Sequence, residues 1–406
     1  MQNRDISDTD RCAIPRERTG LVSRPRLGVL ATHAIQYQAP LYQLLALRQS
    51  IDLSVAFLSA KGNTHHYEPD FASEVTWDID LLAGYSSKLL DGKGISAATW
   101  PWRLIEWIRR QDVVVVHGYS EPAMLFAAAA CRCFRIPYLM RGDSQAVSTA
   151  SGARRLARDL LASFTVGGAY GALTIGELNR RFYCSYGDLP LYSAPYSVDN
   201  DRFRRTASSA RSHRNERLNS LGLDTRLPVA IFSGKLIPRK RPLDAVRAVA
   251  KCHGKFNLLI LGDGPLRKDI AGFEDSLPVR CLGFVNQSEL PRWYACGEIL
   301  VLPSSREPWG LVVNEGMACG LLPVVSSAVG AAPDLVEGLG EVFPVGDIDA
   351  LAAALERAST RHPRSQEAIK ARLDHFTVAS TAAGYEEATL AACDLRGSKR
   401  TKGVSA

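Results

Sequence analysis

The sequence predicts an α/β protein made of two successive units, each built on a parallel sheet covered by helices. Short apolar runs alternate with longer amphipathic segments along most of the 406 residues, which is the pattern of strands and crossover helices in such sheets. The chain is long enough for two or three domains with sizeable cores. A polar, arginine-rich stretch near residue 200 interrupts the alternation and indicates a boundary between the two units.

Apolar runs in each half predict strands, and the amphipathic stretches between them predict helices. In the first half, strands are expected at Leu27–Ala31, Leu53–Phe57, Val113–His117, Tyr138–Arg141 and Ala172–Ile175, with helices at Gln38–Leu47, Glu121–Phe134 and Arg154–Phe164. In the second half, strands are expected at Val229–Phe232, Asn257–Leu261, Val279–Leu282, Ile299–Leu302 and Leu322–Val325, with helices at Pro242–Cys252, Gln287–Cys296, Val312–Cys319, Asp347–Ala358 and Thr377–Cys393. Strands joined by helices run parallel, so each half is expected to form one parallel sheet.

The stretch from Asp199 to Arg226 separates the two halves. It is rich in arginine and lacks apolar periodicity, so we expect a linker there. The predicted organisation is a disordered basic tail (1–24), an N-terminal domain (25–200), a C-terminal domain (201–375), a last helix (376–393) and a second basic tail (394–406).

Composition excludes several classes of protein. No apolar run reaches the ~20 residues that cross a bilayer and no signal peptide is apparent, so we expect the chain to remain in the cytoplasm. The nine cysteines include no CxxC pair and no Cys/His cluster, which indicates neither a disulfide framework nor a structural metal. The net charge of +7 suits anionic partners such as nucleotide diphosphates or anionic lipid, and no nucleic-acid-binding motif accompanies it.

The strongest functional signal is a pair of glutamates eight residues apart, Glu307 and Glu315. Between them, Trp309 and Gly310 separate a predicted strand from the helix expected at Val312. Open α/β sheets bind ligands at the carboxyl ends of their strands, where a helix N-terminus offers unpaired N–H groups. A carboxylate accepts two hydrogen bonds from a diol, so Glu315 suits a ribose. The alternative is that Glu315 is a favourable acid in a first helical turn.

Two glycine turns follow earlier strands of the second half. The segment Gly234–Arg241 contains Lys235 and Lys240 among four cations beside a helix start, which fits a diphosphate. The turn Gly262–Pro265, with Gly264 at its centre, precedes another helix. Taken singly, the first is also explained as a basic surface loop and the second as a plain turn between strand and helix.

In this order and spacing, the three motifs resemble the C-terminal domain of GT-B glycosyltransferases of family 4, the glycosyl transferases group 1. That family shows a Gly-Arg-Leu…Lys-Gly segment, a Gly-x-Gly-Pro turn, and a Glu-x7-Glu segment followed by Gly-x-Pro-Val. Here Lys235 replaces the arginine, Arg241 replaces the glycine after the lysine, and the segment Gly320–Val324 has one additional residue. The resemblance covers residues 25–393 and is dense after residue 228. It implies two Rossmann-like domains facing each other across a cleft, with the last helix crossing back to the first domain.

The resemblance also implies a donor, a UDP- or GDP-linked sugar, held by the C-terminal domain. Lys235 and Lys240 would bind its diphosphate. Glu315 would hold the ribose, and Glu307 would face the donor sugar. The expected donor site consists of Gly234, Lys235, Lys240, Gly264, Trp309, Gly310, Leu311 and Glu315.

The N-terminal half carries fewer signals. His117 ends a predicted strand, where the family has a sugar-contacting histidine, so we expect it in the cleft and in catalysis with Glu307. The alternative is a core histidine whose hydrogen bonds are satisfied within the protein. His33 follows the first predicted strand, and Arg141 and Asp143 end another, so these three are expected to line the same cleft.

The predicted activity is transfer of a sugar from a nucleotide diphosphate to an acceptor hydroxyl, in bacterial polysaccharide or glycolipid synthesis, and the resemblance implies that the anomeric configuration is retained. Basic residues and helix N-termini stabilise a diphosphate leaving group without a metal, and the Asp-x-Asp at Asp78–Asp80 lies far from the donor motifs in sequence. Two alternatives are a sugar-nucleotide epimerase of the same fold and a binding protein that holds a nucleotide sugar without turnover.

The expected partners are the nucleotide sugar, a sugar or lipid-linked acceptor, and the anionic inner face of the plasma membrane. The basic tails suit the membrane surface. Trp100, Trp102 and Trp107 would span about two helical turns, with arginines nearby, and form an interfacial patch. The alternative is that these tryptophans pack in the core of the first domain.

Overall fold

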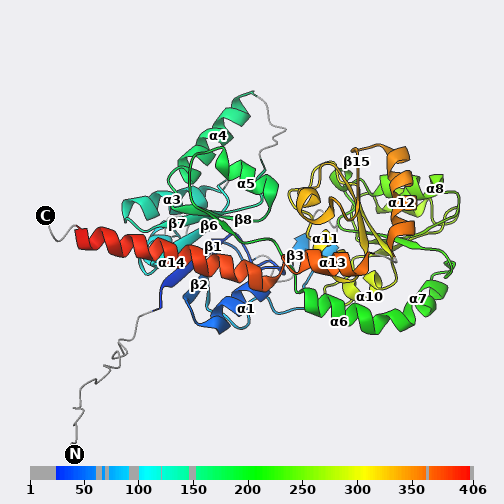
Figure 1. Cartoon of the computed structure of the whole chain (residues 1–406), viewed down its shortest axis with the longest axis horizontal. Helices are drawn as coiled ribbons and strands as arrows, with labels where there is room; N and C mark the ends of the chain where they lie inside the picture. The colour runs from blue at the N-terminus through cyan, green and yellow to red at the C-terminus, as the bar shows by residue number, and fades with distance from the viewer. Residues whose placement is uncertain are drawn as a thin grey trace, which may run out of the picture.

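The computed structural model describes residues 24–60, 66–68, 73–90, 100–119, 121–145, 152–362 and 365–402. They form two α/β domains that lie side by side, with the long helix α14 (Val378–Lys402) extending from their junction along the N-terminal domain (Figure 1). The expected N-terminal tail falls almost entirely on residues 1–23, outside the described residues, whereas residues 394–402 of the expected C-terminal tail are helical and only 403–406 lie outside the described residues. The structure confirms the predicted α/β class and its two parallel sheets.

The N-terminal sheet has seven parallel strands in the order β5-β2-β1-β6-β7-β8-β9. Their bounds are β1 (Arg26–Ala31), β2 (Asp52–Phe57), β5 (Ser87–Leu89), β6 (Val113–His117), β7 (Tyr138–Arg141), β8 (Gly171–Thr174) and β9 (Leu191–Ser193). A separate antiparallel pair joins β3 (His66–Glu68) and β4 (Ser73–Val75). The chain runs outward from β1 and then returns to β6 on its other side, so loops after β1 and β6 flank a switch point, where open sheets bind ligands.

Helices cover both faces of this sheet, which explains why its strands are apolar on both sides. In β6, Val113 and Val115 pack against α1 (Ala39–Arg48) and α14, while Val114 and Val116 pack in a separate core with the remaining helices. These helices are α2 (Trp100–Arg109), α3 (Pro122–Cys133), α4 (Gly152–Val166) and α5 (Glu177–Cys184).

The C-terminal sheet has six parallel strands in the order β12-β11-β10-β13-β14-β15. Their bounds are β10 (Val229–Ser233), β11 (Asn257–Leu261), β12 (Val279–Gly283), β13 (Ile299–Leu302), β14 (Leu322–Ser326) and β15 (Glu341–Phe343). The helical segments are η2 (Pro238–Lys240), α8 (Pro242–Lys251), α9 (Arg267–Ala271), α10 (Leu290–Tyr294), α11 (Leu311–Ala318), η3 (Ala332–Val336), α12 (Ile348–Arg361) and α13 (Gln366–Leu373). The switch point lies between β10 and β13, and two of the sequence motifs follow these strands.

The segment expected to be a linker is helical instead. Residues 200–220 of it form α6 (Asn200–Ala210), η1 (Arg211–His213) and α7 (Arg214–Ser220). Helix α6 buries Phe203, Ala207 and Ala210 in the C-terminal core, and the Asp199 carboxylate accepts a hydrogen bond from the Arg202 N–H at its start. The apolar spacing of four and three residues is helical, but the surrounding arginines made it inconspicuous.

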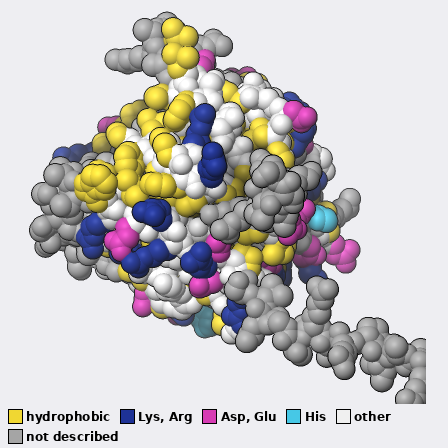
Figure 2. Space-filling model, turned by 90° about the vertical axis from the view of Figure 1, so that its left-hand side faces the viewer, with side chains coloured by type: hydrophobic (Ala, Val, Ile, Leu, Met, Phe, Trp, Pro, Cys, Tyr) yellow, Lys and Arg dark blue, Asp and Glu magenta, His cyan; other side chains and the backbone are white. Residues whose placement is uncertain are grey.

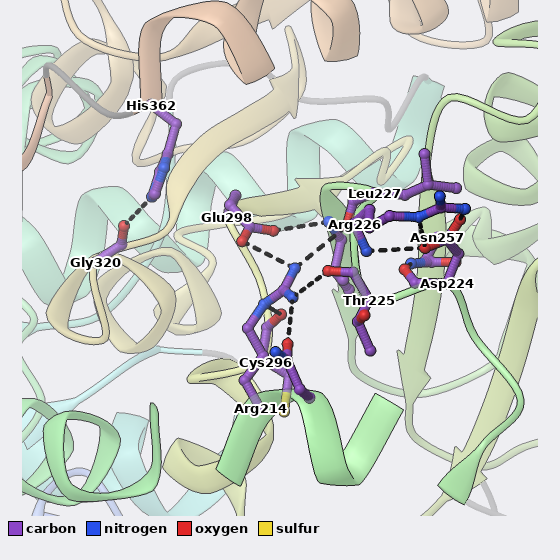
Figure 3. Close-up of polar contacts among 12 residues, drawn as sticks. Arg214, Asp224, Thr225, Arg226, Leu227, Asn257, Cys296, Glu298, Gly320 and His362 are labelled. Carbon is purple, nitrogen blue, oxygen red and sulfur yellow. Dashed lines mark hydrogen bonds and ion pairs between the residues drawn. The ribbon is translucent and has the colours of Figure 1, made fainter. Parts of the chain in front are cut away.

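The arginines of this segment hold the two helices against the C-terminal domain. The Arg214 guanidinium donates to the backbone carbonyls of Cys296, Thr225 and Leu227 and forms an ion pair with Glu298 (Figure 3). This polar, basic segment is therefore held on the C-terminal domain, because its arginine side chains donate hydrogen bonds to backbone carbonyl groups at the ends of loops.

Other expected elements agree with the structure to within a few residues, with two differences. The helix expected over Gln287–Cys296 is shortened to α10, and the last helix continues past residue 393 to Lys402. None of the helices in the described ranges combines the length and apolar content that crossing a bilayer requires.

Candidate active site

The turns after β10 and β11 form one layer at the carboxyl edge of the C-terminal sheet. The Gly234 N–H donates to the Leu261 carbonyl at 2.9 Å, and the Leu236 N–H donates to the Asp263 carbonyl at 2.8 Å. A Cβ at Gly262 would overlap the Gly234 carbonyl oxygen, so the second turn needs glycine for close approach. The structure thus brings the first two sequence motifs, with Gly264 in the second, into direct contact.

Lys240 and Glu307 connect the basic turn to the Glu-x7-Glu motif. The Lys240 ammonium donates to the Glu307 carboxylate, and both side chains are nearly buried, at 12% and 11% exposure. The adjoining backbones are also joined, since the Ser305 N–H donates to the Arg239 carbonyl at 2.8 Å. An ion pair held this way fixes the position of both charges at the switch point of the sheet.

The segment between the two glutamates turns sharply into α11. Gly310 has φ +96°, a left-handed conformation that favours glycine, and it stands just before Leu311, the first residue of the helix. Trp309 is 4% exposed, and its indole N–H donates to Asn314 at 2.9 Å. Its ring packs edge-on against Tyr196 and lies 6.0 Å from Phe376, in the two segments that connect the domains. The expected donor residue Trp309 is therefore placed at the domain junction.

Glu315 lies in α11 and is 8% exposed, with its carboxylate accepting a hydrogen bond from the Tyr294 hydroxyl at 3.1 Å. Burial raises the pKa of Glu315 to about 7, against the opposing effects of Tyr294, Gln287 and Arg202. A hydrogen-bond donor that enters beside the ionised Glu315 carboxylate would stabilise its buried negative charge.

A cavity of about 170 Å³ adjoins Glu315 and lies between the two domains. Its lining from the C-terminal half includes Arg202, Gln287 and Glu315, and that from the N-terminal domain includes Gln36, Tyr37 and Asp80. Polar groups of both domains thus converge on one partly open space, as they do in small-molecule sites.

Residues 76–78 of the N-terminal domain are bound to residues 286–288 of the C-terminal domain, and we call this contact the latch. The Asn286 amide donates to the Thr76 carbonyl at 2.7 Å, and the Ser288 N–H and hydroxyl donate to the Asp78 carboxylate. The rings of Trp77 and Phe284 lie 5.9 Å apart beside it. Asp78 and Asp80, which are far from the donor motifs in sequence, thus lie next to the C-terminal domain in space.

His117 ends β6 and is half-buried, with its ring nitrogens 3.3 Å from the Gln38 amide and 3.3 Å from the Tyr385 hydroxyl. Burial and the nearby charge of Arg141 lower the pKa of His117 to about 3, so the ring is neutral at physiological pH. Both nitrogens have partners within the protein, as expected of the core-histidine alternative. A neutral imidazole here serves as a hydrogen-bonding group and not as a cation.

Arg141 is buried beside His117 and donates to the Ala194 carbonyl at 2.8 Å. Its guanidinium lies 5.1 Å from the ring centroids of both Tyr196 and Tyr385. The expected cleft residue Arg141 thus fixes the segment that enters the C-terminal domain against α14, through aromatic rings that stabilise its charge.

Asp143 and His33 lie at the ends of β7 and β1. The side chain of Asp143 is exposed, and partial withdrawal from water, with the negative charge of Glu307 as a smaller cause, raises its pKa. His33 is half-buried, with its Nδ1 2.9 Å from the Thr32 hydroxyl. Both residues follow strand ends as expected, and their roles in lining the cleft stay predictions.

Sequence reasoning missed several contacts between the domains. The Gln145 amide donates to the Pro308 carbonyl, next to the donor segment. The Asp334 carboxylate accepts from the Glu177 N–H at the start of α5, 3.1 Å from each oxygen. Isolated polar residues more than 150 positions apart leave no periodic signal, so only the folded chain reveals them.

The comparisons with known proteins agree with this arrangement. Residues 227–361 match the family model described as "Glycosyl transferases group 1". The chain is 33% identical over 127 residues to sulfoquinovosyl transferase SQD2 of Arabidopsis thaliana, covering 30% of this chain and 24% of that protein. It is 28% identical over 217 residues to D-inositol 3-phosphate glycosyltransferase of Xylanimonas cellulosilytica, covering 47% of this chain and 52% of that protein. These matches span at most about half of the curated relatives.

A longer match links the chain to the GDP-mannose-dependent monoacylated alpha-(1-6)-phosphatidylinositol monomannoside mannosyltransferase of Corynebacterium glutamicum, which is 24% identical over 311 residues, 72% of this chain and 78% of that protein. Among solved structures, Anabaena Alr3699/HepE in complex with UDP and glucose superposes with a TM-score of 0.66 at 15% identity, covering 90% of this chain and 99% of that one. The catalytic domain of starch synthase IV from Arabidopsis thaliana, bound to ADP and acarbose, gives 0.65 at 14% identity, with coverages of 91% and 99%. The chain therefore has the GT-B fold, as predicted, and its C-terminal domain is homologous to group 1 glycosyltransferases.

Proposed function

We propose that the protein is a retaining glycosyltransferase of family 4 that transfers a hexose from a nucleotide diphosphate to an acceptor hydroxyl. The observation that carries this proposal is the joining of the sequence motifs at one switch point. There Lys240 and Glu307 form an ion pair, and the buried Glu315 faces a cavity between the domains.

The diphosphate would lie over the turn after β10. Lys235, Arg239 and Lys240 supply positive charge there, and the adjacent N-terminus of α8 adds its dipole. These groups stabilise a departing diphosphate without a metal ion. Because Lys240 is already bound to Glu307, its charge is oriented before the donor arrives, and no side-chain ordering accompanies binding.

The nucleoside would occupy the cavity beside Glu315, with the ribose diol donating to the carboxylate. The backbone of Gly310 and Leu311 and the Glu307 carboxylate would contact the sugar. HepE, with UDP and glucose in its solved complex, and the Corynebacterium relative, named for GDP-mannose, support a UDP- or GDP-linked donor.

In the transfer itself, the bond between the sugar C1 and the diphosphate oxygen breaks, and the acceptor oxygen forms a bond to C1 on the same face. The acceptor proton passes to the departing diphosphate. Neutral His117 would hydrogen-bond a sugar hydroxyl by exchanging one of its partners, Gln38 or Tyr385, for the sugar, and Asp143 would face the acceptor side of the cleft. Closure of the domains, held by the latch, would exclude water, which competes as an acceptor.

The acceptor is proposed to be a sugar or a lipid-linked sugar in bacterial polysaccharide or glycolipid synthesis, reached from the cytoplasmic side at the membrane periphery. The Corynebacterium relative, named for an acylated phosphatidylinositol mannoside acceptor, supports the lipid-linked class.

The experiment is a panel of UDP- and GDP-sugars incubated with the protein, a chelator and bacterial lipid extract. The expected result is release of one nucleoside diphosphate, with a product whose anomeric configuration matches the donor by NMR. Formation of an epimerised free sugar nucleotide, or binding without any turnover, would contradict the proposal. Activity that the chelator abolishes would contradict the metal-independent mechanism.

A further inference from the structure

The N-terminal domain exposes a group of large apolar side chains on the helices that cover one face of its sheet. We call these residues the α2–α4 surface; they are Trp102, Phe134, Leu156, Leu160, Leu161 and Phe164, with exposures from 39% to 71%. Figure 2 shows the end of the molecule formed by this domain, where hydrophobic side chains gather with Lys and Arg among them. Contiguous apolar patches on a protein surface usually mark a contact site.

Helix α4 shows that this exposure is not accidental. Among its described side chains, those of Ala162, Thr165 and Val166 are buried. Leu156, Leu160 and Phe164 recur every four residues on the opposite side, and each is at least 44% exposed. A helix that packs on one side and meets water on the other carries polar residues on its outer side, so α4 is suited to an apolar partner there.

Arginines surround these apolar groups. The Arg109 guanidinium lies 5.3 Å from the ring centroid of Phe134, and that of Arg132 lies 5.0 Å from the ring centroid of Phe164. Arg110 and Arg135 are also exposed nearby in sequence. The exposed acid of α2, Glu106, is bound to Arg110. The described acid of α4, Asp159, is half-buried, so positive charge predominates among the described side chains of this surface and lies directly beside the groups that avoid water.

The tryptophans expected to form an interfacial patch are separated by the fold. Trp107 is 3% exposed and donates to the Ser54 hydroxyl, so it belongs to the core. Trp102 is 71% exposed and belongs to the α2–α4 surface, while the side chain of Trp100 lies outside the described part of the chain. The prediction of an interfacial position was wrong for Trp107. Most of the exposed apolar side chains of the α2–α4 surface lie on α4 instead.

We propose that the α2–α4 surface docks on an anionic lipid bilayer. Leu156, Leu160 and Phe164 would enter the boundary between headgroups and acyl chains, and the arginines would meet lipid phosphates, as on amphipathic elements that lie in a membrane interface. The charge favours this partner over a second copy of the chain, because two copies meeting through this surface would bring their arginines together. Lipid binding needs neither donor nor acceptor, so it is tested independently of the transfer reaction.

The test is co-flotation of the full chain with vesicles of phosphatidylglycerol and phosphatidylcholine, compared with vesicles of phosphatidylcholine alone. The double variant Leu156→Ser, Leu160→Ser removes two exposed side chains without touching the core, and we expect it to bind the anionic vesicles at least about tenfold more weakly. Leu47→Ser is the matched control, because Leu47 is 75% exposed on α1, which packs on the other face of the sheet.

A second variant tests the charge. Arg109→Gln should weaken binding about fivefold, and raising salt from about 0.1 M to about 1 M should weaken binding of the wild type. Failure of the wild type to float with anionic vesicles would overturn the proposal, as would equal binding by the wild type and the double-leucine variant. A dimer in sedimentation velocity that the leucine variant abolishes, without lipid binding, would assign the surface to a second copy instead.

Discussion

The C-terminal domain joins its motifs by hydrogen bonds and an ion pair within one loop cluster, whereas the N-terminal domain presents single polar residues at the ends of β1, β6 and β7. Gly234 is hydrogen-bonded to Leu261 in the neighbouring turn, and Lys240 is paired with Glu307. His117 and Arg141 are held by α1, α14 and the segments between the domains. The difference indicates that the groups proposed to bind the donor are already positioned within the C-terminal domain, while the proposed N-terminal half of the site depends on how the domains meet.

The largest expected effect comes from breaking the Lys240–Glu307 pair. Lys240→Met leaves the nearly buried Glu307 carboxylate without its partner, and we expect the free energy of unfolding to fall by about 3–5 kcal/mol in urea titration. The double variant Lys240→Met, Glu307→Leu should recover much of this loss, since both charges are then gone. Lys255→Met is the control, because its pair with Glu356 is exposed and should contribute little. An equal loss of unfolding free energy in Lys240→Met and Lys255→Met would show that the Lys240–Glu307 pair does not organise the C-terminal site.

The second prediction concerns the pH dependence that Glu315 gives to this domain. Its pKa in the folded protein, about 7, lies above the ordinary value of 4.5, so the folded state binds more protons between these pH values. The wild type should therefore lose up to about 3 kcal/mol of stability as pH rises through this interval. Glu315→Gln should lack this loss. Its free energy of unfolding, relative to that of the wild type, should therefore be higher at pH 8 than at pH 5. Parallel stability curves in thermal or urea unfolding would contradict the buried, proton-binding carboxyl.

A smaller effect should come from the latch, which tests how far the domains depend on each other. Asp78→Ala removes the acceptor of two hydrogen bonds from Ser288, and we expect about 1 kcal/mol of lost closure energy. Affinity for the donor nucleotide should fall about fivefold, and the radius of gyration from X-ray scattering should rise. Ser288→Ala should have a similar effect. The double variant should lose no more donor affinity than either single variant. Additive effects would show that the two residues do not act through one contact.

The contrast between domains also explains what could be predicted from the sequence. Strands and crossover helices were found because burial on both faces leaves uninterrupted apolar runs, as in β6 and β13. The segments that we propose to bind the donor could be recognised because Lys240, Gly262 and Glu307 belong to short motifs at strand ends. The places of Asp78 and Gln145 could not be predicted, because each depends on the relative position of two domains. Trp309 was assigned to the donor from its neighbours in sequence, while its ring packs at the domain junction.

The central claim is that the C-terminal domain holds the nucleotide and that His117 belongs to the other half of the site. Calorimetric titration of UDP and GDP into the wild type, Glu315→Ala and His117→Ala tests it most directly. We expect one nucleotide to bind the wild type, to bind Glu315→Ala at least about tenfold more weakly, and to bind His117→Ala with unchanged affinity, since a hydrogen bond to a charged group contributes about 1.5–3 kcal/mol. Unchanged binding by Glu315→Ala, or loss of binding by a folded His117→Ala, would contradict this division between the domains.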